Sequence, residues 1–285
     1  MIYDHEIPKG ARLYFGATAK LKRKIEDVAS EVLYRYGFEE IVTPLFSYHQ
    51  HLYIEDEREL IRLNDEANRA LSIRADSTID VVRLISNRLG RSTDHRKWFY
   101  IQPIYRYPTR EYYQIGAEWL ESQDVASILK ILLEIFDRLE IRPQLQISNI
   151  KIPLLLDQKY NLSLEVQKSA DIDKILENEN DWIRDLLYLS KPEQIDGLIG
   201  VVPEPIETEL LKIKEIATSI NYDNLIVAPL YYAKMRYYQE LFFRFFDRNE
   251  TLAMGGEYLA QELKACGFAI YTDMIIKSLK VENES

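Results

Sequence analysis

The chain has 285 residues, 47% of them hydrophobic, and 46 acidic against 36 basic residues give a formal net charge of −10. This length and apolar content predict one domain over 1–285, with room for an inserted segment. Because nucleic-acid binding needs a basic surface, we expect no nucleic-acid partner. The sequence shows neither a signal peptide nor an apolar run long enough to span a bilayer, so we expect no membrane association and a cytoplasmic location.

The first third of the chain predicts one long helix, short strands and a second helix. Apolar residues recur at helical spacing over 17–36, and Gly37 ends this helix. A strand is expected over 38–46, where a proline requires an edge or a bulge. Shorter strands are expected at 58–63 and 71–74. Asp76-Ser-Thr78 offers short polar side chains that cap a helix running to residue 89.

Residues 100–118 predict a β-hairpin, since two apolar-aromatic runs flank a Pro-Thr turn. Arg106 precedes the bend. On the second arm Gln114, Gly116 and Glu118 share one face. That face carries an amide and a carboxylate with a glycine between them, where a small ligand could approach the backbone closely. The alternative is an edge hairpin with one solvated face.

The rest of the chain predicts an α+β fold. A helix over 122–139 and a strand over 144–150 precede a long helical segment at 156–222, interpreted as an insertion within the domain. Strands are expected at 225–230, 237–247 and 265–271, followed by a helix at 273–279. Strands with helices packed on one side indicate a mainly antiparallel sheet flanked by helices.

Cysteine and histidine give no sign of metal chemistry. The single cysteine, Cys266, excludes an intrachain disulfide and a cysteine-based metal cluster, and its apolar surroundings predict a buried thiol. His49 and His51 are close in sequence but lack a third ligand at suitable spacing. We therefore expect no metal and no cofactor.

The order of these segments resembles the catalytic domain of class II aminoacyl-tRNA synthetases, specifically histidyl-tRNA synthetase. Ile7-Pro-Lys-Gly-Ala11 looks like the start of that domain, and Gly37-Phe-Glu-Glu-Ile-Val-Thr-Pro44 is similar to its first motif, which forms the dimer interface. Arg74-Ala-Asp-Ser-Thr78 is similar to the family's Arg-Pro-Glu-x-Thr segment. Residues 99–118 look like the second motif, of which Gln114-Ile-Gly-Ala-Glu118 is the most specific part.

The resemblance implies a histidine-binding site. In the family, the equivalents of Asp76, Thr78 and Gln114 hold the ammonium group. That of Glu118 faces the imidazole, and that of Arg106 meets the carboxylate or the ATP phosphate, roles that suit these side chains. The implied ligand-binding set is Asp76, Thr78, Arg106, Gln114, Glu118, Tyr237 and Tyr238. The alternatives are a helix N-cap for Asp76 and a surface ion pair for Arg106.

Departures from the family pattern predict that the chain is not an enzyme. The family's Arg-Gly-Leu-Asp-Tyr-Tyr-Thr-Gly aligns with Ala233-Lys-Met-Arg-Tyr-Tyr-Gln-Glu240, which loses its arginine. The Gly-Gly-Arg-Tyr-Asp-Gly loop becomes Gly255-Gly-Glu-Tyr-Leu-Ala260, and Met274 replaces the ATP-binding arginine of the third motif. Since developing phosphate charge needs fixed cations, we expect no adenylation and no catalytic residue.

A synthetase-like domain without these arginines, and without an anticodon-binding domain, resembles the regulatory subunit of ATP phosphoribosyltransferase. That resemblance implies a role in histidine biosynthesis. The implied partners are a short catalytic subunit that the chain activates, a second copy in a homodimer through about 23–48, and free histidine. The alternatives are a divergent synthetase paralogue that activates an amino acid with ATP, and a stand-alone amino-acid-binding module.

Overall fold

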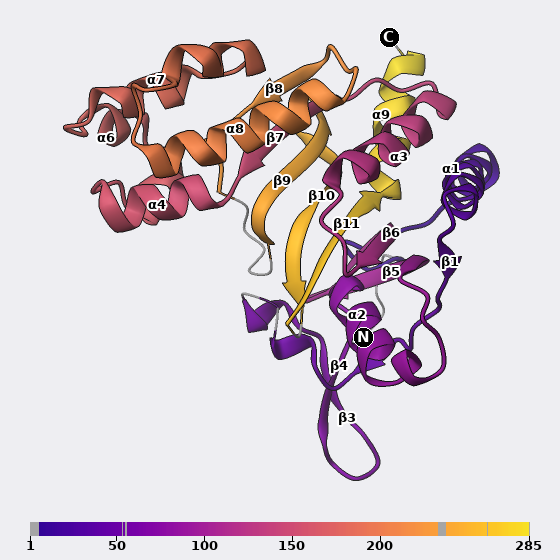
Figure 1. Ribbon diagram of the computed structural model, residues 1–285. Helices are drawn as coiled ribbons and strands as arrows, with labels where there is room; N and C mark the ends of the chain where they lie inside the picture. Colours follow the sequence, from indigo (N-terminus) through magenta and orange to yellow (C-terminus); the bar gives the residue numbers. More distant parts are fainter. Residues whose placement is uncertain (1–5, 53, 55, 233–237, 261, 285) are drawn as a thin grey trace.

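The computed structural model describes residues 6–52, 54, 56–232, 238–260 and 262–284. An eight-stranded sheet with the order β1-β5-β6-β11-β10-β9-β7-β8 forms its centre (Figure 1). The strands are β1 (Glu39–Glu40), β5 (Lys97–Arg106), β6 (Arg110–Leu120), β7 (Gln144–Asn149), β8 (Leu225–Val227), β9 (Tyr238–Asp247), β10 (Glu250–Ala260) and β11 (Leu263–Tyr271). The edge pairs β1–β5 and β7–β8 are parallel. The pairs between them are antiparallel, as predicted.

Helices cover the two faces of this sheet unequally. On one face α1 (Gly16–Arg35), α3 (Val125–Arg138) and α9 (Thr272–Glu284) form the large core with Ile115, Ala117 and Cys266. On the other face α2 (Thr78–Asn87) packs against Tyr100 and Tyr258 in a smaller core. The two cores explain the alternation along β6, since successive side chains of a strand point to opposite faces.

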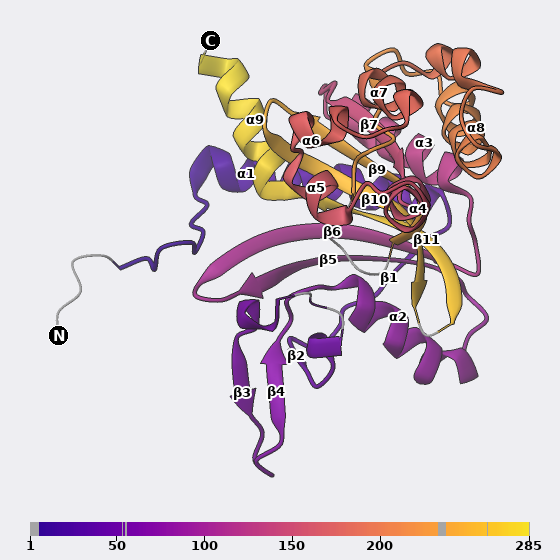
Figure 2. The ribbon, with the colours of Figure 1, turned by 90° about the vertical axis from the view of Figure 1, so that its left-hand side faces the viewer.

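A three-stranded sheet projects from the body below α2 (Figure 2). Its order is β2-β4-β3, with β2 (Phe46–Ser47), β3 (Arg62–Asn64) and β4 (Ala70–Ile73). Short 3-10 helices, η1 (Gln50–Leu52) and η2 (Glu57–Glu59), lie between β2 and β3, and η3 (Leu89–Arg91) follows α2. This small sheet carries the chain from β2 to the start of α2.

The segment between β7 and β8, which contains the predicted insertion, is helical. It comprises α4 (Lys151–Lys159), α5 (Leu164–Ser169), α6 (Ile172–Leu176), α7 (Asp181–Tyr188), the 3-10 helix η4 (Pro192–Leu198) and α8 (Glu204–Ser219). These helices lie together beside the β7–β8 end of the main sheet (Figure 1). Among the described helices of the chain, none is long and apolar enough to cross a membrane.

Most predicted elements are confirmed, with shifted ends, but three predictions are wrong in whole or in part. The strand expected over 38–46 reduces to β1 and the start of β2. Of the strand expected over 58–63, only residues 62–63 are in a strand, β3, and residues 58–59 are in the 3-10 helix η2. The Gly-Gly segment, expected as a loop, lies inside the long strand β10. The hairpin of β5 and β6 is interior, between β1 and β11, which excludes an edge hairpin. Cys266 is fully buried, as predicted.

Candidate functional site

A pocket lies on the α2 face of the main sheet, where the first turn of α2 meets β6, β10 and β11. Its lining residues are Asp76, Thr78, Gln114, Glu118, Tyr238, Met254, Tyr258, Gly267, Phe268, Ala269 and Tyr271. Five of the seven predicted ligand residues therefore line one cavity. The cavity volume is about 10 Å³, which is room for roughly one water molecule. A ligand the size of an amino acid enters only if wall side chains move.

Glu118 is the buried acid at the centre of this pocket. Its side chain is 1% exposed. The Tyr258 hydroxyl donates to its Oε2 at 2.7 Å, and the Tyr100 hydroxyl donates to Oε1 at 3.3 Å. Burial raises the pKa of Glu118 to about 8 because a charged carboxylate loses its water there. At neutral pH the carboxyl is therefore largely protonated, and it can donate as well as accept a hydrogen bond.

Glycines beside Glu118 make room for its neighbours. A Cβ on Gly116 would stand 2.1 Å from Cζ of Tyr100, so the Tyr100 ring fills the space over this residue. That corrects the expectation that a ligand approaches the backbone there. The Tyr100 hydroxyl also lies 3.2 Å from Oγ1 of Thr78. A Cβ on Gly267 would stand 2.2 Å from Oε2 of Glu118, so this second glycine gives the carboxyl its place.

Gln114 presents a buried acceptor to the pocket. It is 3% exposed, and its Oε1 has no hydrogen-bond partner among the described residues. An unsatisfied buried carbonyl costs roughly 1–3 kcal/mol, so a ligand that donates a hydrogen bond here would recover that cost. An ammonium group is such a donor, and Asp76 lines the same cavity.

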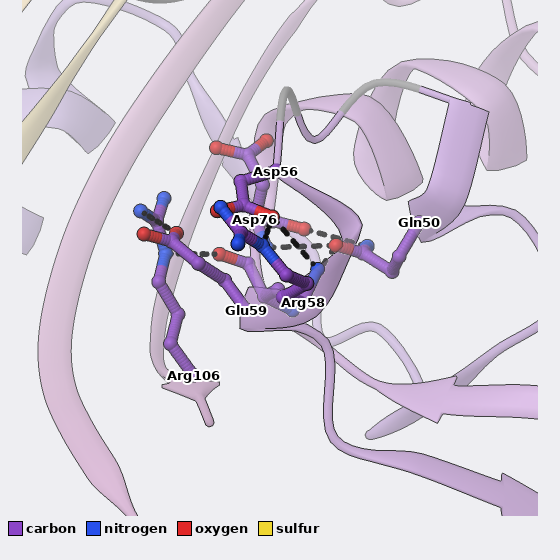
Figure 3. A network of polar contacts seen from close by, with 7 residues as sticks. Gln50, Asp56, Arg58, Glu59, Asp76 and Arg106 are labelled. Atoms are coloured by element: carbon purple, nitrogen blue, oxygen red, sulfur yellow. Dashed lines mark hydrogen bonds and ion pairs between the residues drawn. The ribbon is translucent and has the colours of Figure 1, made fainter. Parts of the chain in front are cut away.

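Asp76 lies at the start of α2, where the sequence offered a helix N-cap as the alternative to a ligand contact. Helix α2 begins at Thr78 and is preceded by Ser77, whose side chain makes no capping hydrogen bond and whose backbone is itself helical, with φ −91° and ψ −34°. Asp76 lies one residue earlier, is 4% exposed, and lines the pocket. The backbone of this residue is held by the side chain of Gln50 (Figure 3).

Arg106 lies outside the cavity lining. Its Nη1 pairs with Oε2 of Glu59 at 2.8 Å, and its Nε donates to the Ala75 carbonyl at 3.5 Å (Figure 3). The side chain of Arg106 is 25% exposed and that of Glu59 36%. The alternative of an ion pair at the surface thus describes Arg106 in this structure, and binding a ligand carboxylate would require a change of partner.

Of the remaining positions singled out in the sequence, two are not described by the structure and one lies against the large core. Tyr237 and Ala233 lie outside the described residues. Met274 packs, partly buried, against the large core. Across the described part of the chain, no group of three or more acidic, histidine or cysteine residues is placed to hold a metal ion.

Sequence reasoning missed three tyrosines of the site, Tyr100, Tyr258 and Tyr271. Tyr258 and Tyr271 line the cavity, and Tyr100 joins Thr78 to Glu118. Burial raises the pKa of Tyr271 to about 12, so its hydroxyl stays neutral. Cross-strand alternation would have found Tyr258, had residues 250–260 been recognised as a strand.

The fold and this pocket define a histidyl-tRNA synthetase-like domain. The family model described as histidyl-tRNA synthetase matches residues 11–275. A solved structure from Bacillus halodurans, titled as an ATP phosphoribosyltransferase regulatory subunit/histidyl-tRNA synthetase, superposes with a TM-score of 0.79 at 20% identity. It covers 98% of this chain and 84% of that one, a likeness that concerns the fold alone.

Two curated relatives are more similar in sequence, and both carry the name ATP phosphoribosyltransferase regulatory subunit. The one from Wolinella succinogenes is 47% identical over 284 residues, 100% of this chain and 99% of the relative. The one from Helicobacter hepaticus is 39% identical over 98% of this chain and 99% of the relative. The chain therefore belongs to the histidyl-tRNA synthetase family, among its ATP phosphoribosyltransferase regulatory subunits.

Proposed function

We propose that the chain is a non-catalytic regulatory subunit that assembles with a short catalytic chain of ATP phosphoribosyltransferase and activates it. The observation that carries this proposal is the 47% identity over the full length to a relative of that name. Phosphoribosyl transfer to ATP would then be the task of the partner, and this chain would act in histidine biosynthesis in the cytoplasm.

The absence of enzymatic activity is supported by side chains at two family arginine positions. Met274 supplies no charge, and Glu257 supplies the opposite charge. Glu257 pairs with Cys266 in the β10–β11 register, so it points to the large-core face of the sheet, opposite the pocket, and burial raises the pKa of Glu257 to about 7. Neither residue can stabilise a developing phosphate charge. We expect no amino-acid-dependent pyrophosphate exchange, and exchange above background would instead favour a divergent synthetase.

Free histidine is the ligand that we propose for the pocket. Asp76 and the orphaned oxygen of Gln114 suit its ammonium group, and Glu118 suits its imidazole. A charged hydrogen bond contributes roughly 1.5–3 kcal/mol, so loss of the arginine at residue 233 should weaken binding by about one to two decades relative to an intact family site. Calorimetry on the native chain and on Glu118→Ala tests this, and binding unchanged by the substitution would contradict it.

We also propose a homodimer through residues 23–48. Large apolar side chains are exposed there, with Val42 at 80%, Phe46 at 57% and Tyr34 at 54%. An exposed apolar patch of this kind indicates a protein interface, and a two-fold contact between identical patches is the usual arrangement.

Reconstitution with the short catalytic chain of the same organism tests the central proposal. We expect co-elution of the two chains in size-exclusion chromatography and faster phosphoribosyl transfer in the mixture than with the catalytic chain alone. If the two chains neither associate nor affect each other's activity, the proposal is wrong, and histidine binding without association would favour a stand-alone binding module.

A further inference from the structure

The side chains of Gln50 and Arg106 form hydrogen bonds with the backbone of residues 75 and 76, the segment that connects β4 to α2. Oε1 of Gln50 accepts hydrogen bonds from the amides of Ala75 at 3.0 Å and Asp76 at 2.8 Å. Nε2 of Gln50 donates to the Asp76 carbonyl at 2.8 Å. Arg106 donates to the Ala75 carbonyl at 3.5 Å, a long and weak contact. Because buried backbone groups must be paired, the position of this segment depends chiefly on Gln50.

Gln50 is itself held in one orientation. Its Nε2 also donates to Oδ2 of Asp80 at 2.7 Å, and Oδ1 of Asp80 accepts a hydrogen bond from the Ser47 hydroxyl at 2.8 Å. Gln50 is 1% exposed, Asp80 7% and Ser47 8%. A reversed amide would place its NH₂ group against two amide N–H groups and its oxygen against a carboxylate, so only one orientation satisfies these partners.

We propose that Gln50 is a positioning residue for the ligand pocket. By holding the backbone of Asp76, it fixes where the Asp76 carboxylate meets the ammonium group of a bound amino acid, and Asp80 and Ser47 fix Gln50. Gln50 contacts no ligand in this scheme and lies outside the segments that resemble synthetase motifs. The inference rests on the proposed ligand. It adds that a residue outside the cavity lining, Gln50, determines how well the pocket binds the ammonium group.

The substitution Gln50→Glu tests this with two probes, histidine and imidazolepropionate, which lacks the ammonium group. The variant keeps an oxygen for the two amides but turns the other oxygen toward the Asp76 carbonyl and the Asp80 carboxylate. We expect histidine affinity to fall roughly 10- to 100-fold, the range of one charged hydrogen bond. We expect the affinity for imidazolepropionate to change little. Calorimetry measures both.

Gln167→Glu is the matched control. Gln167 is 6% exposed, and its Nε2 holds the backbone carbonyls of Pro153 at 3.0 Å and Leu162 at 2.8 Å in the helical segment, outside the pocket lining. This control variant also replaces a buried amide with a carboxyl group, and it should leave the affinity for both probes unaltered. Amide exchange without ligand gives a second readout, in which Gln50→Glu should speed exchange at residues 75 and 76 and Gln167→Glu should not.

Equal loss of affinity for both probes would overturn the inference, because a general disturbance of the pocket would then explain the data. No loss for either probe would also overturn it, because Gln50 would then have no effect on binding. Unchanged exchange at residues 75 and 76 would also overturn it. A native chain that binds neither probe removes the ligand and this inference with it. Activation of the catalytic chain is measured separately, so the regulatory proposal stands or fails on its own assay.

Discussion

Replacing Glu118 with glutamine should remove a pH dependence of folding stability that the buried acid creates. Its pKa is about 8 in the folded chain against 4.5 for an ordinary glutamate. The folded state thus binds this proton more tightly than the unfolded state. The stabilisation is complete below pH 4.5 and is lost as pH rises to about 8. The slope approaches about 1.4 kcal/mol per pH unit between the two pKa values and flattens near each of them, which gives a loss of roughly 3.5 kcal/mol between pH 5 and pH 8.

Urea unfolding at several pH values measures this difference directly. Glutamine has the shape of the protonated acid, so Glu118→Gln should exceed the stability of the native chain by only about 1 kcal/mol near pH 5 and by about 4 kcal/mol near pH 8. Glu215→Gln, on the exposed face of α8, is the control and should show no such trend. Buried acids outside the pocket act equally in the native chain and the variant and cancel. A difference that stays constant from pH 5 to pH 8 would refute the reasoning.

Three further predictions follow from contacts elsewhere in the fold. Val42→Asp should turn the proposed dimer into a monomer in light scattering without lowering stability, since this side chain is 80% exposed; an unchanged mass would contradict the interface. Gly116→Ala should cost roughly 1–3 kcal/mol in urea unfolding through overlap with the Tyr100 ring, and a neutral effect would mean that the ring has room to move. Arg74→Met should cost about 3 kcal/mol, because it leaves the carbonyls of Thr43 and Pro44 without their guanidinium donor; a loss below 1 kcal/mol would show that water replaces the donor.

The sequence predicted elements whose own periodicity is strong. The long helix α1, the β5–β6 hairpin and α3 each bury one face, and the pattern of apolar residues records that face directly. The strand expected over 38–46 failed for a tertiary reason. Side chains distant in sequence bind its backbone, since Gln102 accepts from the Thr43 amide and Arg74 donates to the Thr43 carbonyl. A local pattern contains no sign of such partners.

Strand β10 was missed because its two glycines resemble a loop. They serve close packing instead: a Cβ on Gly255 would stand 2.5 Å from Cζ of Phe243 and 2.2 Å from the Gly267 carbonyl. In the site, the resemblance led to Asp76, Gln114 and Glu118, which lie within recognisable motifs. It could not lead to Gln50, which reaches the pocket only through the backbone of another segment.

The tight closure of the pocket has a kinetic consequence. The pocket that Asp76 and Glu118 line has a free volume of only about 10 Å³, so if histidine binds there as proposed, an opening step must come before or during binding. If opening comes first, the observed binding rate levels off as ligand concentration rises, at the rate of opening, and the apparent affinity falls by the fraction of molecules that are open. The occupancy of such a pocket would respond to changes in ligand concentration that last longer than the closed state. It would not respond to changes that are shorter than this lifetime.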